Sequence, residues 1–303
     1  MTSVKFFRRL AVATAIFAYL QIALGGVVRV SGSGLGCPDW PLCHGRPYPP
    51  ADLHAIVEYS HRAVGSVTGV LIIATVVAAW VVWRTRRPAV AWLATASLIG
   101  VVGEGVLGGV VVVNELASWL VLIHLGLAMI ILGALVATAV MSMPASPGVA
   151  DPQFRRLAAI AAAATYLLLL TGSTVVASGA DTACRAWPLC GAGLTPDFAG
   201  VNAFTMLHRG SVLVIGTLLV FVLFRAARLV GLRVVAIATL AVFAMQVAVG
   251  AAAAITDASF FNGLHVALAT LLWAGTLATA MLALPRADRD AQPSRMVVQK
   301  GSA

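Results

Sequence analysis

The sequence CPDWPLCHGRPYP, residues 37–49, and a second version, CRAWPLCGAG, residues 184–193, decide how this chain is organised. Both contain Cys-x-x-Trp-Pro-Leu-Cys, and each Cys, Trp, Pro and Leu of the second copy lies 147 positions after its counterpart. The stretches on either side of both loops are strongly apolar. Two similar loops set into apolar sequence indicate an internal repeat.

The repeat extends well beyond the loops. The features that recur at the offset of 147 are Gly25 and Gly172, His61-Arg62 and His208-Arg209, and Gly69 and Gly216. The register then slips by five or six residues, after which the matching positions are Gly108 and Gly250, and His124 and His265. Chance can match one motif, but this ordered series indicates a duplicated unit.

The composition indicates a membrane protein. Of 303 residues, 60% are hydrophobic and 10% charged, with a mean hydropathy of +0.97, whereas soluble domains are about half apolar. Apolar runs of about 20 residues, enough to cross a ~30 Å hydrocarbon core as a helix, recur throughout. The expected spans are residues 10–30, 60–83, 89–113, 117–141, 157–177, 206–226, 233–255 and 263–284. The first span resembles a signal peptide, but its length and the absence of a small-residue cleavage site predict that it is retained.

The net charge of +9 comes from short basic clusters between the spans. This is the pattern of a polytopic membrane protein, and it argues against nucleic-acid binding. With eight spans, 15 of the 20 Lys and Arg residues fall on one side, whereas an odd number of spans would scatter them. We therefore expect a multi-pass protein of a bacterial cell membrane, with both termini cytoplasmic. The two cysteine loops, about 31–59 and 178–205, should then be extracytoplasmic.

The expected fold is an all-α integral membrane protein with eight transmembrane helices. Four spans per repeat unit give parallel halves, so we expect two tandem four-helix bundles related by pseudo-two-fold symmetry. The expected domains are an N-terminal half, 1–145, a C-terminal half, 146–285, and a basic cytoplasmic tail, 286–303.

Four of the six histidines recur in register, and they are the main candidates for a functional site. His61 and His208 should begin the second helix of their units, and His124 and His265 should lie in the first turns of the fourth. Both helices start from the outer face, so the members of each pair should lie at similar depth. Two imidazoles facing one bundle interior can ligate a metalloporphyrin from opposite sides.

Other interpretations of these residues stay open. The histidines can be capping or core residues, or they can bind zinc or copper, although such a mononuclear site normally needs three or four clustered ligands. Arg62 and Arg209 are candidates for binding haem propionates, but they equally suit arginines that reach the lipid headgroups. His44 and His54 recur nowhere and are interpreted as loop residues.

The two halves differ in their acidic residues. Glu58 lies three residues before His61 and shares its helix face, whereas the equivalent position before His208 is Thr205. An added carboxylate beside a haem-type histidine favours proton handling or binding of a reacting group; a helix-dipole role is the alternative. Glu104 lies within the third span, and we expect it to line the first cavity without a catalytic role.

The cysteines lie in pairs on the side of the membrane where disulfides form. Bridges between Cys37 and Cys43 and between Cys184 and Cys190 are sterically reasonable, since the intervening proline helps the chain turn back. Because such short loops gain little entropy from a bridge, shaping a lid over a pocket is a better explanation than global stability. A redox role is also open.

These motifs together resemble those of haem A synthase of the bacterial type with paired cysteines. The resemblance is carried by EYSHR, LIHLGLA, LHRG, GLHVALA and the two cysteine loops, and it covers about residues 10–284. It implies a haem b cofactor held by His208 and His265, substrate haem O near His61 and His124, and a catalytic role for Glu58. It also implies a disulfide in each loop.

The resemblance implies oxidation of a methyl group of haem O to a formyl group, giving haem A for haem-copper oxidases. Candidate partners are haem O synthase and an electron-transfer partner or quinone. The residues agree independently on one point, because the half with the extra carboxylate should be the reacting half. The alternatives are a two-haem membrane cytochrome for quinol-linked electron transfer and a transporter with parallel repeats.

Overall fold

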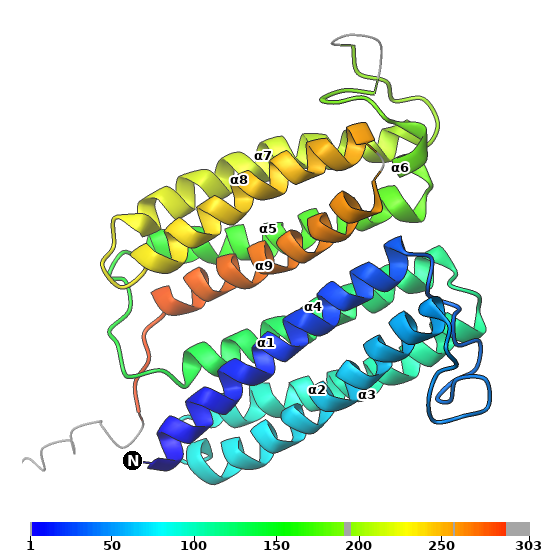
Figure 1. Cartoon of the computed structure of the whole chain (residues 1–303). Helices are drawn as coiled ribbons and strands as arrows, with labels where there is room; N and C mark the ends of the chain where they lie inside the picture. The colour runs from blue at the N-terminus through cyan, green and yellow to red at the C-terminus, as the bar shows by residue number, and fades with distance from the viewer. Residues whose placement is uncertain (1, 191–194, 257, 289–303) are drawn as a thin grey trace, which may run out of the picture.

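The computed structural model describes residues 2–190, 195–256 and 258–288, and nearly all of that chain is helical (Figure 1). The long helices are α1 (Thr2–Val30), α2 (Leu53–Trp83), α3 (Pro88–Val113), α4 (Ser118–Met141), α5 (Pro152–Ala177), α7 (Asn202–Ala227), α8 (Arg233–Thr256) and α9 (Ser259–Ala283). A four-residue helix, α6 (Ala180–Ala183), lies in the second outer loop. Most of the predicted cytoplasmic tail lies outside the described residues.

Eight helices are long and apolar enough to cross a membrane, which confirms the predicted all-α membrane fold. Five of them begin at least four residues earlier than expected, and in two of these, α2 and α5, an aspartate caps the N-terminus. Asp52 accepts a hydrogen bond from the Ala55 N–H at 3.0 Å, and Asp151 accepts one from the Gln153 N–H at 2.9 Å. Helix α2 therefore starts seven residues before the predicted span. As a result, both Glu58 and His61 lie inside the helix and not at its start.

The helices form two groups, α1–α4 and α5 with α7–α9 (Figure 1). Helices α4 and α9 are the most buried spans, and α3 and α8 are among the least buried. Between the groups, the Trp273 indole on α9 donates to the Met129 carbonyl on α4 at 3.0 Å. Gly133 faces the same indole, and Gly26 on α1 faces Val266 on α9. Such small residues allow close helix approach in membranes, where van der Waals packing drives association.

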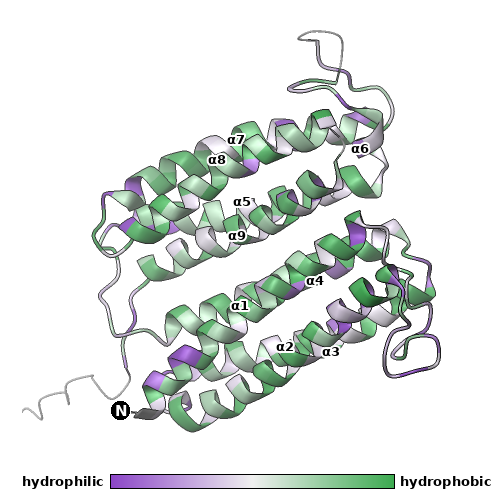
Figure 2. Cartoon of the chain, in the orientation of Figure 1, coloured by the Kyte–Doolittle hydropathy of each residue, from purple (hydrophilic) through white to green (hydrophobic). Residues whose placement is uncertain are grey.

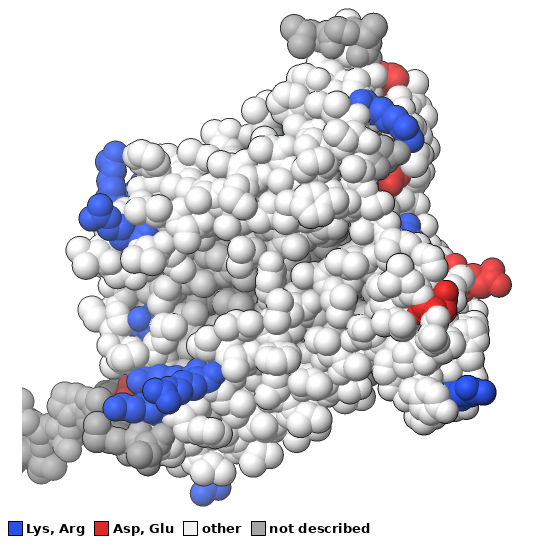
Figure 3. Space-filling model, in the orientation of Figure 1, with Lys and Arg blue, Asp and Glu red and all other residues white. Residues whose placement is uncertain are grey.

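The outer surface of both groups is apolar along the helices (Figure 2). Large side chains such as Ile99, Val113 and Leu213 are each more than two-thirds exposed, as expected for contact with lipid. Figure 3 shows basic side chains gathered at the end of the molecule that holds the N-terminus, whereas the acidic side chains visible on this face lie mainly at the opposite end. The charged groups therefore bracket an apolar band.

Candidate functional site

The four repeated histidines lie on four different helices and are all partly buried. His61 on α2 and His124 on α4 are close enough for their charges to interact, and the same holds for His208 on α7 and His265 on α9. The structure thus brings the histidines together as one pair in each group of helices.

Every one of these imidazole rings faces a glycine on a neighbouring helix. The distances from a Cβ added at the glycine to the nearest ring carbon are 3.0 Å for Gly25 and His61, 3.4 Å for Gly108 and His124, 3.0 Å for Gly172 and His208, and 2.7 Å for Gly250 and His265. A Cβ at Gly25, Gly172 or Gly250 would press on the ring, whereas at Gly108 it would make an ordinary contact. Four of the recurring glycines of the sequence therefore lie directly against the recurring histidines, and we call these four positions the glycine seats.

Each ring also has a polar neighbour, and sequence reasoning missed most of these contacts. The pairs are Gln21 Nε2 with His61 Nε2 at 3.3 Å, Thr171 Oγ1 with His208 Nδ1 at 2.9 Å, Gln246 Nε2 with His265 Nε2 at 3.2 Å, and Glu104 Oε1 with His124 Nδ1 at 3.1 Å. In three cases the polar residue lies four positions before the facing glycine, so both share a helix face. These polar neighbours could have been found in the sequence, because three of them are polar residues one helical turn before a repeated glycine.

Several buried polar atoms around the rings have no hydrogen-bond partner. They are Nδ1 of His61, His124 and His265, and one side-chain oxygen each of Gln21, Glu104 and Gln246. Such atoms are rare in native proteins and call for an explanation. A group that takes up a ring nitrogen of each histidine supplies one.

Two histidines per pair fit an axially ligated haem. Within the described residues no group of three or more His, Cys, Asp or Glu side chains could hold a metal ion, so the mononuclear zinc or copper interpretation has no ligand set there. The glycine seats leave room for each ring against its neighbouring helix, and the partnerless nitrogens are of the type that ligates iron. The metal-ligand roles of the four histidines stay predictions.

The glycines lie at different distances from their histidine rings, so replacing each with alanine is expected to affect haem binding to different extents. Gly250→Ala is expected to displace the His265 ring, since the added Cβ would lie 2.7 Å from it. Overpacking of this kind costs about 1–3 kcal/mol, or roughly 5- to 150-fold in haem affinity. Gly108→Ala is the matched control, because its 3.4 Å contact with His124 is tolerable. The haem content per chain, measured after each variant has been loaded with haem, gives the effect of each substitution. An equal loss of haem in the two variants would contradict the expectation.

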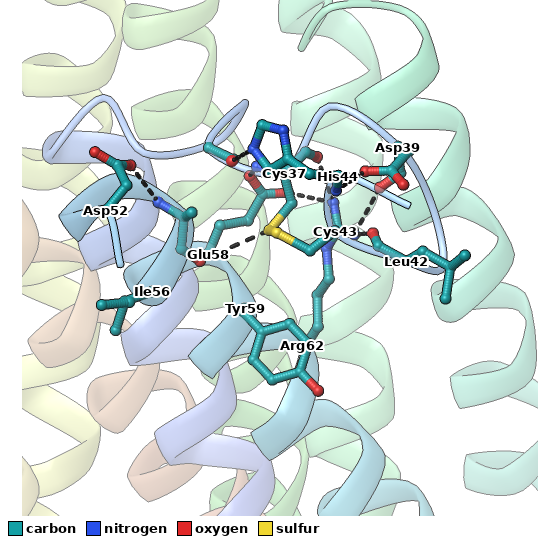
Figure 4. The surroundings of a disulfide bond; sticks show 12 residues. Cys37, Asp39, Leu42, Cys43, His44, Asp52, Ile56, Glu58, Tyr59 and Arg62 are labelled. Atoms are coloured by element: carbon teal, nitrogen blue, oxygen red, sulfur yellow. Dashed lines mark hydrogen bonds and ion pairs between the residues drawn. A yellow bond between two sulfur atoms is a disulfide. The ribbon is translucent and has the colours of Figure 1, made fainter. Parts of the chain in front are cut away.

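Glu58 is turned toward the first cysteine loop (Figure 4). Its side chain is nearly fully buried. One carboxylate oxygen accepts a hydrogen bond from the Cys37 backbone N–H at 2.7 Å. The other accepts a hydrogen bond from the Arg62 guanidinium at 2.5 Å. Thr205, its counterpart, instead donates to the Ala180 carbonyl at 3.4 Å. The extra carboxylate of the first half therefore links α2 to the disulfide loop.

Arg62 fastens the same loop. Its guanidinium donates to the carbonyls of Cys37 at 2.8 Å, Asp39 at 2.7 Å and Leu42 at 2.6 Å. In the second half, Arg209 donates to the Pro188 carbonyl at 3.0 Å and lies 4.0 Å from Cys190 Sγ, counting the residues up to 190 and from 195 onward. A haem propionate would compete with these carbonyls, so the proposed propionate roles of both arginines stay predictions.

The cysteine loops are closed as the sequence suggested. Disulfides join Cys37 to Cys43 and Cys184 to Cys190. The Trp40 ring of the first loop packs on α3, where a Cβ on Gly109 would lie 2.9 Å from it. This contact places the loop over the helix that carries Glu104 and the glycine seat of His124.

His44 lies in the first outer loop, whereas His54, which was expected to be a loop residue, lies in the first turn of α2 because Asp52 caps the helix there. His44 Nε2 lies 2.9 Å from the Gly36 carbonyl, and His54 Nδ1 lies 3.0 Å from the Ser33 hydroxyl. The backbone N–H groups of Gly45 and His44 hold the pKa of Asp39 below its usual value. The contribution of Asp39 to loop order is therefore present at neutral pH and is lost in acid, as the carboxylate protonates.

The two arginines predict a difference in loop stability. Arg62→Ala removes hydrogen bonds to three carbonyls and the partner of Glu58, whereas within the described part of the second loop Arg209→Ala removes one carbonyl contact and a 4.0 Å contact with Cys190 Sγ. Hydrogen bonds from charged groups contribute about 1.5–3 kcal/mol, so Arg62→Ala is expected to speed opening of its loop at least tenfold. Hydrogen exchange of peptides spanning each cysteine pair measures the effect. An equal response of the two loops would contradict it.

Comparison with known proteins places this arrangement in a family. Residues 8–56 and 52–277 match the COX15-CtaA family, described as cytochrome oxidase assembly protein. A curated relative named "Heme A synthase" from Symbiobacterium thermophilum is 31% identical over 302 residues, covering 93% of this chain and 96% of the relative. Others with that name are from Shouchella clausii, 29% identical over 290 residues (89% of this chain, 94% of the relative), and Alkalihalophilus pseudofirmus, 31% identical over 222 residues (70% and 72%). The matched residues include both cysteine loops and all four paired histidines, and the chain belongs to the COX15-CtaA family.

Proposed function

We infer that this chain is a haem A synthase, a membrane oxidoreductase that converts haem O to haem A. The observation that carries this function is the pairing of four glycine-seated histidines in a chain that is similar to curated haem A synthases over nearly its full length. The sequence-based alternative, a two-haem cytochrome that leaves porphyrins unmodified, provides no distinct role for the Glu58 side of the molecule.

The two histidine pairs take different haems in this proposal. His208 and His265, in the C-terminal half 146–285, hold a resident haem b. His61 and His124, in the N-terminal half 1–145, receive haem O. The support is an asymmetry between the halves, since among the described residues the first half has the carboxyl of Glu104 3.1 Å from His124, where the second half has the amide of Gln246 beside His265. When bound, the resident haem supplies one-electron redox chemistry.

The reaction proceeds on the substrate's methyl group. Two successive hydroxylations, each a two-electron oxidation driven by an external oxidant (O2, or an electron acceptor with water as the oxygen source), give a hydroxymethyl group and then a gem-diol, which loses water to leave the formyl group. This chain's residues bind and orient the substrate. The His61 and His124 rings fix the porphyrin plane, while Glu58 and Arg62 hold the disulfide loop at the outer end of α2. In this role Glu58 orients the site or carries protons at its carboxylate.

The charge distribution supports an orientation with both termini in the cytoplasm and the cysteine loops outside. The substrate site then opens toward the outer half of the membrane. Haem O synthase is the natural supplier of substrate, and an electron-transfer protein or quinone is the natural redox partner. Neither partner is a nucleic acid.

Pigment analysis tests the function directly. The chain is expressed in a host that makes haem O but lacks its own haem A synthase, and extracted haems are separated by chromatography. We expect hydroxylated haem O and haem A to accumulate. Bound haem b with unmodified haem O under every redox condition would favour the two-haem cytochrome instead.

A further inference from the structure

The second and third long helices of each half, α2 with α3 and α7 with α8, lie side by side and meet along a seam (Figure 1). In the second half this seam is filled. The Phe243 ring on α8 lies against Gly216 on α7, where an added Cβ would be 2.7 Å from the ring. Gly216 is buried as a result, so the ring closes the space between the two helices.

The matching seam of the first half is open. Gly69 on α2 is the counterpart of Gly216, but a Cβ added at Gly69 would have no described atom beyond its own helical backbone within 4 Å. The position of Phe243 falls on Val101 of α3, at the offset of 142 that also relates the glycine seats of α3 and α8. The smaller valine leaves Gly69 only half-buried.

The open seam continues toward the first histidine pair. Gly105 stands one turn of α3 before the seat at Gly108, and a Cβ there would also meet no described atom outside its own helical backbone within 4 Å. Its counterpart in the second half is Val247. Val101, Gly105 and Gly108 follow one another at spacings of four and three residues, so they share one face of α3. This is the face that meets His124, so the seam leads into the histidine site.

The two haems of the proposed function, on which this inference rests, differ in the same respect as the two seams. Haem O carries a long isoprenoid chain where haem b has a small vinyl group. With the porphyrin inside a four-helix bundle, such a chain has to leave between two helices. Lipid and protein are similarly apolar partners for it, so an open seam contributes little affinity. A filled seam excludes the chain by steric overlap, and specificity is often achieved in this way.

We propose that Phe243 is a specificity-determining residue that excludes haem O from the second histidine pair. At the first pair, the isoprenoid chain of haem O leaves the bundle between α2 and α3, past Gly69 and Gly105. A ligand is expected at the inner end of this seam, because Nδ1 of His61 is buried there with no hydrogen-bond partner among the described residues. The porphyrin occupies the histidine site in both halves, and the seam decides which porphyrin fits.

The repeat supplies the variants that test this proposal. Val101→Phe gives the first seam the ring of the second, and Phe243→Val removes that ring from the second seam. Gly103→Met is the matched control, since it copies Met245 of the second half. Residues two apart on a helix point in nearly opposite directions, so this change lies on the other side of α3 from Gly105.

Two measurements on full-length chains report the outcome. Chains that already hold haem b are titrated with haem O and, separately, with further haem b, and optical spectra give the affinity of the first site for each. Chains produced under haem starvation are loaded with haem O alone, and pigment extraction gives the haem O content per chain. The haem b spectrum of the second site confirms that the Val101→Phe and Gly103→Met variants are folded.

We expect Val101→Phe to weaken haem O binding about tenfold or more, the usual effect of overpacking, while haem b binding at the same site changes little. Gly103→Met should bind both haems as the unsubstituted chain does. Phe243→Val should take up a second haem O per chain, where the unsubstituted chain takes up one.

The inference would be wrong if Val101→Phe left haem O binding unchanged, weakened both haems equally, or had no larger effect than Gly103→Met. It would also be wrong if Phe243→Val still took up a single haem O. Each of these results leaves the proposed function intact, because the unsubstituted chain still binds haem O. If the unsubstituted chain held haem b but bound no haem O, both proposals would fail.

Discussion

Alanine at His208 or His265 is expected to abolish the low-spin haem b spectrum of the purified protein. Each ring is seated against a glycine, Gly172 or Gly250, and each has a polar neighbour that leaves one ring nitrogen for a ligand. Under the proposed function, loss of either ring removes one of the two ligands of the haem iron. Reduced-minus-oxidised spectra and haem content per chain measure the result.

The control for this prediction lies in the other half. His61→Ala is expected to abolish haem A formation while most of the haem b spectrum remains, because His61 belongs to the other pair. If His61→Ala removed the haem b spectrum and His208→Ala did not, the assignment of substrate and cofactor sites would be reversed.

The second large effect is expected at Glu58. Glu58→Ala should lower haem A formation by about 10²-fold or more, the usual contribution of a positioned acid or base, while leaving the haem b spectrum intact. The carboxylate is buried against the Cys37 N–H and the Arg62 guanidinium, so its loss also leaves Arg62 without its counter-charge. The rate of haem O conversion in membranes, together with the spectrum, measures both parts.

Two variants separate the chemical role of Glu58 from its hold on the loop. Thr205→Ala, the matched change in the second half, should have little effect on conversion. Arg62→Ala loosens the loop but keeps the carboxylate, so a loss as large as that of Glu58→Ala would assign the whole effect to loop position. If the Glu58→Ala variant converted haem O to haem A at the unsubstituted rate, the proposed catalytic role of Glu58 would be wrong.

Span number, repeat register and the identity of the paired histidines could all be read from the sequence. Hydrophobic length is a local property, because each helix must satisfy its own backbone in lipid, and the offset of 147 needed only residue matching. The starts of α2 and α5 were missed because Asp52 and Asp151 cap polar turns that precede the apolar runs.

The tertiary structure alone decided what each of these side chains touches. Helices that are apolar on all sides carry no stripe that says which face turns inward, so the sequence could not show that glycines seat the histidines or that Glu104 meets His124. Glu58 was expected to face His61, since three residues on a helix share a face, yet its carboxylate reaches the Cys37 N–H and Arg62. The sequence by itself determined which residues recur, and only the packing of helices and loop determined their partners, because contacts between segments depend on rotations that no local pattern encodes.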